Sequence, residues 1–137
     1  MIKFARLLAF LSAFFCTSAL ATEGGTPMTV TGATTIEAAE AKALFDQGVA
    51  FVDPRSSADF DAGRIPEAYH LDINSDLTET ALLDVVSKDE PVVFYCNGPK
   101  CGRSAKSCAK AVEWGFTKVY YFRDGMPGWM AAGYPVE

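Results

Sequence analysis

Short apolar runs alternate with segments of helical periodicity along most of the chain. Residues 49–52, 92–95 and 119–122 are four-residue runs rich in Val, Phe and Tyr, as expected for strands that are buried on both faces. The stretch 68–73 has a less regular pattern and is expected to form another strand. Strands of this kind, separated by helical segments, indicate an α/β fold.

Capping signals locate the helices between these strands. Thr34 and Glu37 have the spacing of a capping box, and Gly48 is expected to end the helix that follows. Asp76 and Glu79 give a second capping signal, ahead of a helix that continues through residue 86 and ends before residue 91. Further helical segments are expected at 57–61, 104–114 and 127–132.

Because helices separate the strands and leave little room for hairpins, the sheet is predicted to be parallel and covered by helices on both faces. Ligands of such sheets bind at the carboxyl ends of the strands. Asp53, Cys96 and Arg123 each follow a predicted strand directly. These side chains are therefore expected to converge at one edge of the sheet.

The first 21 residues have the features of a cleavable signal peptide. Lys3 and Arg6 precede an apolar stretch over 7–15, and a small-x-small pattern ends at Ala21. This stretch is too short for a membrane span of about 20 residues. Cleavage after Ala21 is predicted, with a periplasmic or secreted product, no membrane association after cleavage, a flexible lead-in over 22–34 and one folded domain over 35–137.

The chain is acidic, with a net charge of −5, and loses Lys3 and Arg6 on cleavage. An acidic domain without a basic stripe argues against nucleic acid as a partner, and none is expected. The stretch 91–111 is a local exception, because it carries no acidic residue. Its basic residues are Lys100, Arg103, Lys106 and Lys110.

Three cysteines remain after cleavage: Cys96, Cys101 and Cys108. Three are too few for a disulfide-built scaffold, and an odd number leaves at least one thiol free or bonded to another molecule. Cys108 falls on the apolar stripe of a predicted helix and is expected to pack in the core. His70 is the only histidine and has no second ligand signal near it, so no metal site is predicted.

Cys96 is the leading candidate nucleophile. It stands between a predicted strand and the start of a helix, where backbone N–H groups and the helix dipole stabilise a thiolate. Gly98 and Gly102 allow the loop backbone to turn its N–H groups toward an anion, and Lys100 and Arg103 add positive charge. A buried structural cysteine is the alternative.

Four segments resemble, in order, those of the single-domain rhodaneses, a family of sulfurtransferases. They are V-D-P-R at 52–55, G-R-I-P-E-A at 63–68, the loop from 96 to 104, and G-M-P-G-W at 125–129 with A-G-Y-P-V at 132–136. The resemblance covers nearly the whole domain from residue 35. It implies a rhodanese-like α/β fold with a central, mostly parallel five-stranded sheet and helices on both faces.

The resemblance also implies a mechanism and a set of site residues. Cys96 would attack the outer sulfur of a donor such as thiosulfate, hold it as a transient persulfide, and pass it to a thiol or cyanide. No other cofactor is implied. The expected partners are a small sulfur-containing anion, a thiol acceptor and a periplasmic redox protein. The expected substrate-binding residues are Asn97, Gly98, Lys100, Cys101, Gly102, Arg103 and Ser104.

Asp53 and Arg55 are candidate supports for this loop, and an ordinary solvated pair is the alternative. The loop itself departs from the family pattern, since six residues separate Cys96 from Arg103, more than is usual. Alignment on the strand selects Cys96 as the nucleophile, whereas alignment on the helix start moves Cys101 nearer the anion pocket. We favour Cys96.

Cys101 has several roles open to it. The two loop cysteines can form a disulfide if their Cα atoms come within ~7 Å. Cys101 would then be a resolving thiol, a redox switch, or half of an inactivating disulfide; alternatively it is an adventitious second thiol. Three functions compete accordingly: a sulfurtransferase, a thiol–disulfide or oxyanion-reducing enzyme, and a non-catalytic binding module. A phosphatase ranks lowest, because the loop length fits poorly.

Overall fold

The computed structural model describes residues 25–137. The predicted signal peptide over residues 1–21 and its cleavage after Ala21 lie outside the described residues. Among the residues described, the model contains no helix with the length and apolar character needed to cross a membrane.

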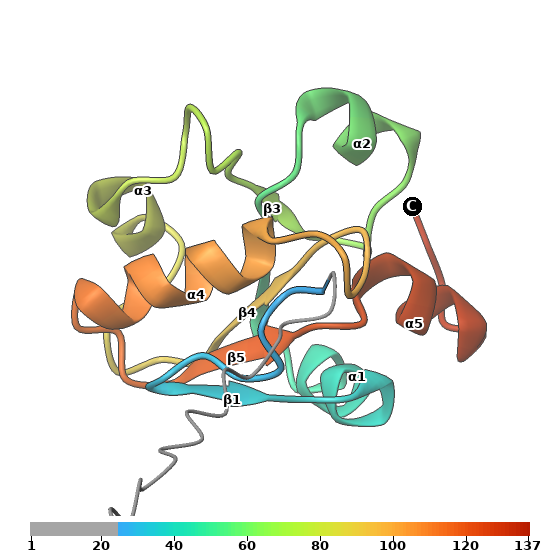
Figure 1. Cartoon of the computed structure of the whole chain (residues 1–137), viewed down its shortest axis with the longest axis horizontal. Coiled ribbons are helices and arrows are strands. Elements are labelled where there is room, and N and C mark those ends of the chain that lie inside the picture. Colours follow the sequence, from blue (N-terminus) through green and yellow to red (C-terminus); the bar gives the residue numbers. More distant parts are fainter. Residues whose placement is uncertain (1–24) are drawn as a thin grey trace, which may run out of the picture.

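A five-stranded parallel sheet forms the centre of the molecule (Figure 1). The strand order across the sheet is β1-β5-β4-β2-β3, and every neighbouring pair is parallel. The predicted α/β architecture with a central five-stranded sheet is therefore confirmed. The strands are β1 (Ala33–Thr35), β2 (Ala50–Asp53), β3 (Tyr69–His70), β4 (Val92–Tyr95) and β5 (Val119–Phe122).

In the described part of the chain, five helices lie between the strands or follow the last one (Figure 1). The two hydrophobic clusters show that α3 and α4 pack on one face of the sheet, whereas α1 and α5 pack on the other. Each connection between two strands crosses back over the sheet, so that every strand starts at the same edge, as parallel pairing requires. The helices are α1 (Ala38–Asp46), α2 (Ser57–Ala62), α3 (Glu79–Leu83), α4 (Arg103–Glu113) and α5 (Gly125–Ala131).

The central strand β4 is buried on both faces, which explains its continuous apolar sequence. Val92 and Phe94 belong to the cluster under α3 and α4, whereas Val93 and Tyr95 belong to the cluster under α1 and α5. Successive side chains of a strand point to opposite faces, so four apolar residues in a row serve both cores.

Trp129 of α5 is the largest side chain buried completely. Its ring packs edge-on against Phe45, Phe51 and Tyr134, with centroids 5.0–6.1 Å apart. The indole N–H donates to the carbonyl oxygen of Pro135 at 2.7 Å, so burial leaves no polar atom of the ring unpaired. This aromatic cluster fixes α5, which lies beside the end of β4.

The structure corrects several expectations about the ends of elements. β1 begins at Ala33, inside the stretch predicted as a flexible lead-in. Thr34 lies in that strand, and the capping box of α1 consists of Glu37 and Glu40 instead. Helix α3 is capped by Thr78, not Asp76, and it ends at Leu83. The predicted strand at 68–73 is reduced to two residues. By contrast, β4 and β5 have the predicted bounds.

The carboxyl ends of the strands meet at one edge, as predicted. Asp53 is the last residue of β2, Cys96 follows β4, and Arg123 follows β5. Since β4 lies between β2 and β5, Cys96 occupies the middle of this edge. The strand order therefore places the candidate nucleophile between the other two residues.

Gly125 begins α5 in contact with the backbone of Cys96. Its φ is +56°, a conformation that disfavours residues with a side chain, and a Cβ atom here would overlap the carbonyl group of Cys96. The next N–H group, that of Met126, donates to the same carbonyl oxygen at 2.9 Å. The glycine thus allows α5 to hold the start of the loop directly.

We expect Gly125→Ala to lower the free energy of unfolding by about 3 kcal/mol, because it combines a strained φ with a backbone collision. Gly48→Ala is the matched control. Gly48 has a similar φ of +81° but no atom within 4 Å of an added Cβ, so strain alone should cost about 1 kcal/mol. Denaturant unfolding measures both values, and equal losses would contradict the proposed collision.

Candidate functional site

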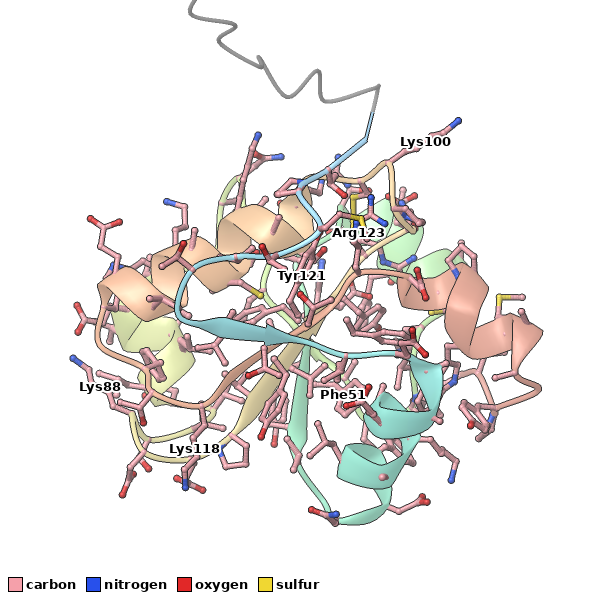
Figure 2. All side chains as sticks on the ribbon, turned by 60° about the horizontal axis from the view of Figure 1, so that its bottom comes forward. Phe51, Lys88, Lys100, Lys118, Tyr121 and Arg123 are labelled. Atoms are coloured by element: carbon pink, nitrogen blue, oxygen red, sulfur yellow. A yellow bond between two sulfur atoms is a disulfide. The ribbon has the colours of Figure 1, made fainter. Side chains whose placement is uncertain are left out.

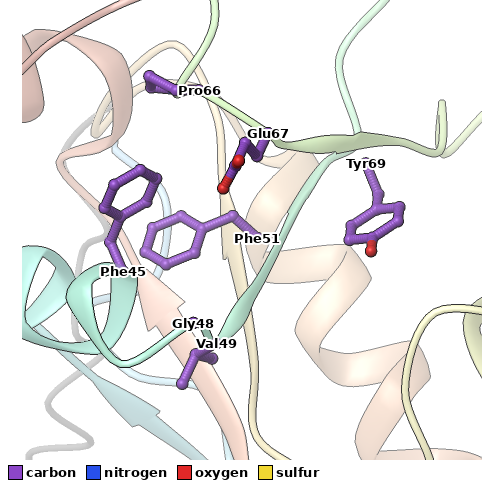
Figure 3. Close-up of a pocket in the computed structure, with 7 residues that line it drawn as sticks. All are labelled: Phe45, Gly48, Val49, Phe51, Pro66, Glu67 and Tyr69. Atoms are coloured by element: carbon purple, nitrogen blue, oxygen red, sulfur yellow. The ribbon is translucent and has the colours of Figure 1, made fainter.

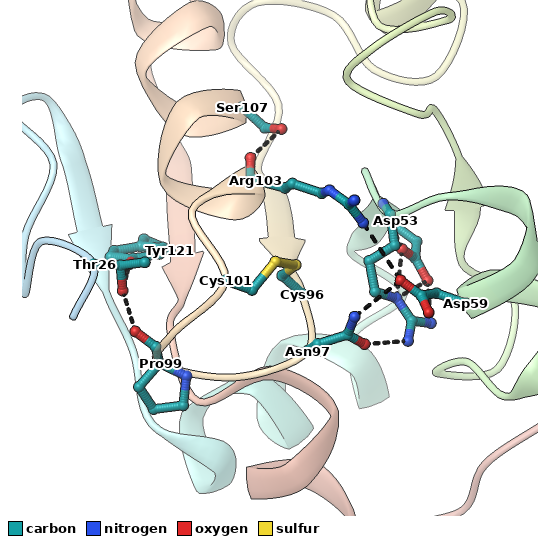
Figure 4. Close-up of a disulfide and its surroundings, with 11 residues drawn as sticks. Thr26, Asp53, Asp59, Cys96, Asn97, Pro99, Cys101, Arg103, Ser107 and Tyr121 are labelled. Carbon is teal, nitrogen blue, oxygen red and sulfur yellow. Dashed lines mark hydrogen bonds and ion pairs between the residues drawn. A yellow bond between two sulfur atoms is a disulfide. The ribbon is translucent and has the colours of Figure 1, made fainter. Parts of the chain in front are cut away.

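The loop between β4 and α4 contains two cysteines joined by a disulfide (Figure 4). The Cα atoms of Cys96 and Cys101 are 6.1 Å apart. Cys96 is completely buried at the end of the strand, whereas Cys101 is partly exposed. Within the loop, Gly98 has a φ of +122° and its carbonyl oxygen accepts from the N–H of Cys101 at 3.0 Å. This turn brings the second cysteine back over the first.

Helix α4 starts immediately after the disulfide. Its N-cap, Gly102, provides no side-chain hydrogen bond, so the N–H groups of the first turn remain available to an anion. Ser104 is 1% exposed, and its hydroxyl has no hydrogen-bond partner within the described residues. These groups lie next to the loop and supply donors for a bound anion or a thiolate.

The loop and the start of α4 carry two basic residues and no acidic one. Lys100 is exposed and extends away from the body of the protein (Figure 2). Arg103 is instead directed to Asp59 of α2, with 3.4 Å between Nη1 and Oδ2. Of the two cations predicted beside the anion pocket, Lys100 is thus available, whereas Arg103 helps to join α2 to the loop.

A buried ion pair lies at the end of β2, beside the loop. Asp53 is 0% exposed and Arg55 is 3% exposed, so the alternative of a solvated pair is excluded. Arg55 Nη2 and Nε donate to Asp53 Oδ2 at 2.6 Å and to Oδ1 at 2.9 Å. Burial alone would lower the pKa of Arg55, but the hydrogen bonds and charge of Asp53 outweigh it and raise that pKa. The guanidinium of Arg55 therefore stays charged.

Tyr95, the last residue of β4, completes the coordination of Asp53. Its hydroxyl donates to Asp53 Oδ2 at 2.8 Å and accepts from the N–H of Ile65 at 3.1 Å. Burial and then the neighbouring carboxylate raise the pKa of Tyr95 far above its ordinary value of 10.0. The phenol stays protonated and acts as a structural donor, linking the segment at Ile65 to the ion pair.

The ion pair extends to the loop through Asn97 (Figure 4). Arg55 Nη1 donates to Asn97 Oδ1 at 2.8 Å, and Asn97 Nδ2 donates to Asp59 Oδ2 at 3.0 Å. The hydrogen bond from the Asn97 amide lowers the pKa of Asp59 below its ordinary value of 3.8; burial opposes this shift, and Ser56 and the nearby arginines support it. Both sides of the Asn97 amide are thereby fixed, and with them the residue after Cys96.

Thr26 holds the opposite side of the loop (Figure 4). Its N–H and hydroxyl both donate to the carbonyl oxygen of Pro99, at 3.1 and 2.6 Å. Arg123 Nη2 donates to the Thr26 carbonyl oxygen at 3.2 Å, and the Tyr121 hydroxyl donates to that of Pro27 at 3.0 Å. The segment at 26–27 is thus tied both to β5 and to the loop.

Two hollows differ in their relation to this site. One of about 280 Å³ borders the loop at Asn97 and is lined by both polar and apolar side chains, including those of Arg55, Asp59 and Met130. The other, of about 370 Å³, is lined by Phe45, Gly48, Val49, Phe51, Pro66, Glu67 and Tyr69 (Figure 3). It contacts the start of β2 and contains no cysteine, so we assign the chemistry to the loop.

The structure brings most of the predicted site residues together. The predicted nucleophile and the seven predicted substrate-binding residues all lie on the loop or at the start of α4, and Asp53 and Arg55 lie beside them. The eight are Cys96, Asn97, Gly98, Lys100, Cys101, Gly102, Arg103 and Ser104, with Pro99 between them. Asn97 is bonded to the ion pair rather than left free for a ligand.

Two other candidate groups lie outside this chemistry. Cys108 is completely buried on α4, as predicted, and burial raises its pKa far above the ordinary value of 9.0. His70 Nε2 lies 2.8 Å from the carbonyl oxygen of Arg55, and its ring stacks on Phe60. Among residues 25–137 no cluster of three or more His, Cys, Asp or Glu side chains could hold a metal ion.

Three residues that shape the site were not predicted: Thr26, Asp59 and Tyr95. Asp59 lies in a short helix capped by Ser56, and Tyr95 resembles any apolar strand residue. Their hydrogen bonds to Pro99, Asn97 and Asp53, respectively, join residues that are 73, 38 and 42 positions apart in the chain. No local pattern in the sequence signals such contacts.

Loss of the ion pair should be costly. We expect Arg55→Met to lower the free energy of unfolding by about 3–5 kcal/mol, because it leaves the buried Asp53 carboxylate without its cation. Lys88→Met is the control, since Lys88 and Glu79 form a 2.6 Å pair whose side chains are 44% and 43% exposed. Its removal should cost less than about 1 kcal/mol in the same denaturation experiment. Similar losses would contradict the role given to burial.

Comparison with known proteins identifies relatives along most of the domain. Residues 37–132 match the family described as the rhodanese-like domain. The chain is 36% identical over 98 residues to thiosulfate sulfurtransferase GlpE of Pseudomonas savastanoi pv. phaseolicola, covering 72% of this chain and 87% of that one. It is 30% identical over 90 residues to a sulfurtransferase of Allochromatium vinosum, covering 66% and 79%.

Solved structures give the same fold. The BH2092 protein from Bacillus halodurans superposes with a TM-score of 0.67 at 25% identity, covering 77% of each chain. The polysulfide-sulfur transferase homodimer from Wolinella succinogenes gives a TM-score of 0.63 at 20% identity, covering 77% of this chain and 79% of that one. The second likeness bears on the fold alone.

Proposed function

The chain belongs to the rhodanese-like family, and on that premise we propose that it is a sulfurtransferase acting through a persulfide on Cys96. It would take a sulfane sulfur from a small anion such as thiosulfate and pass it to a thiol or to cyanide. The observation that carries the proposal is the position of Cys96. This residue ends the central strand, directly before a loop and a helix start rich in anion-binding groups.

The proposed reaction has two steps, formation of the persulfide and transfer of its outer sulfur. The thiolate of Cys96 attacks the outer sulfur of thiosulfate, and sulfite leaves with the electron pair of the broken S–S bond. The free N–H groups of α4 and the positive charge of Lys100 favour an anionic donor and an anionic persulfide. A thiol or cyanide then attacks the outer sulfur and restores the Cys96 thiolate.

The Cys96–Cys101 disulfide blocks this cycle, because the sulfur of the nucleophile is already bonded. The oxidised protein is therefore inactive in sulfur transfer, and reduction has to precede the reaction. The same bond favours a second candidate function, thiol–disulfide exchange with the two cysteines as a redox pair. The two functions differ in whether sulfite is released from thiosulfate.

We expect the pre-reduced protein to form thiocyanate from thiosulfate and cyanide, and the oxidised protein to be inactive until dithiothreitol is added. Cys96→Ser should lower the rate by about a thousandfold or more, because the nucleophile is lost. Cys108→Ser should leave it unchanged, since that thiol is buried in the core. Activity that survives Cys96→Ser but disappears in Cys101→Ser would identify Cys101 as the nucleophile instead.

We also propose that the protein acts in the periplasm or after secretion. Two observations support this location: the sequence of residues 1–21 has the features of a signal peptide, and disulfides persist in oxidising compartments. In bacteria that express the full-length chain, osmotic shock should release a product whose N-terminal sequence starts at Thr22. Retention of Met1 in a cytosolic fraction would overturn the assignment.

A further inference from the structure

Sulfur transfer to an external acceptor needs only Cys96. The second loop cysteine, Cys101, suggests another route by which the sulfane sulfur could leave. We propose that Cys101 attacks the Cys96 persulfide, so that the sulfane sulfur leaves as hydrosulfide and the Cys96–Cys101 disulfide remains. The protein would thereby act as a sulfane-sulfur reductase whose turnover consumes an external dithiol. This inference rests on the sulfur transfer proposed above and adds a reductive step at the same site.

The geometry of the product is already present in the structure. The two Cα atoms are 6.1 Å apart and the two sulfur atoms are bonded. A loop that allows Cys101 to bond to Cys96 Sγ also allows the Cys101 thiolate to reach that atom while it carries an outer sulfur. The required approach is local, because the N–H group of Cys101 is held by the carbonyl oxygen of Gly98 at 3.0 Å.

The loop is fixed on both sides of the two cysteines. Arg55 and Asp59 bind the side chain of Asn97, and Thr26 donates two hydrogen bonds to the carbonyl oxygen of Pro99. Little conformational freedom is then left to lose when Cys101 approaches Cys96 Sγ. Attack within such a preorganised loop has a high effective concentration, which an external acceptor thiol lacks.

Burial separates the roles of the two sulfurs. Cys96 is completely buried, whereas Cys101 is partly exposed on the loop. An external thiolate therefore reaches Cys101 first and expels Cys96 as the leaving thiolate. Cys96 lies beside the amino end of α4, whose dipole stabilises the anion that leaves.

The step balances in atoms and electrons. The Cys101 thiolate forms a bond to Cys96 Sγ, and the bond from that Sγ to the outer sulfur breaks. The outer sulfur takes the electron pair and a proton and departs as hydrosulfide. It gains two electrons, which the two cysteine sulfurs supply as they form their disulfide. A dithiol, such as that of a reducing protein in the same compartment, then reduces the disulfide and is itself oxidised.

The third cysteine of the folded domain cannot replace Cys101. Cys108 is completely buried on α4, and its thiol is directed to the carbonyl oxygen of Tyr120 at 3.7 Å. Burial raises its pKa, so the thiolate needed for attack does not form at neutral pH. Cys108→Ser therefore removes a thiol without removing the proposed chemistry.

The test is a single turnover without an external acceptor. Mature protein is reduced with dithiothreitol, freed of it under argon, and mixed with one equivalent of thiosulfate. Sulfite and hydrosulfide are quantified as their bimane derivatives, and intact mass reports the covalent state of the chain. Wild type and Cys108→Ser should release the two products in equal amounts and end two hydrogen atoms lighter, as the disulfide form.

Cys101→Ser should still release sulfite, because the attacking thiol of Cys96 remains, and this release also shows that its site is folded. It should retain one additional sulfur on Cys96, and its hydrosulfide should fall by about tenfold or more, because the internal attack is lost. A stable persulfide on wild type, without hydrosulfide, would overturn this inference and leave sulfur transfer intact. Equal hydrosulfide from wild type and Cys101→Ser would also overturn it. Absence of sulfite from wild type would reject the underlying transfer itself.

Discussion

The buried charge of Asp53 is the constraint on which the arrangement of the loop depends. A carboxylate with no exposure at the end of a sheet is tolerated only if a cation and hydrogen bonds surround it. Arg55 and Tyr95 meet that requirement, and Arg55 has one more nitrogen to satisfy. That nitrogen binds Asn97. The arginine that neutralises Asp53 at the end of β2 thereby also fixes Asn97, the residue that follows the candidate nucleophile.

Two kinds of interaction fix the site: electrostatic contacts hold the loop, and apolar packing holds α5. The ion pair orients the loop, while the aromatic cluster around Trp129 fixes α5, whose first residues contact the backbone of Cys96. A loop longer than the family pattern would otherwise have more conformations available to it. Its three attachments, at Cys96, Asn97 and Pro99, let it accommodate a second cysteine in a defined position.

Sequence patterns predicted what depends on local composition. The bounds of β4 and β5 followed from their apolar runs, and the loop was located by Cys96 and its glycines. By contrast, β1 has only three residues, which are half-buried or exposed, and its extended form comes from pairing with β5. Its presence also moved the cap of α1 from Thr34 to Glu37. The bonds of Asn97 depend on tertiary structure, which a single sequence does not display.

The attachment of Thr26 to Pro99 has a practical consequence for handling the protein. Because Thr26 lies against the sulfur-bearing loop, any peptide fused ahead of it emerges beside the reactive cysteines rather than at a remote surface. An affinity tag, a linker or a fluorescent fusion placed there starts next to the loop that carries Cys96 and Cys101. The opposite terminus is also engaged, since Glu137 exchanges backbone hydrogen bonds with Arg64. Fusion partners are therefore best kept away from Thr26 and the loop that it holds.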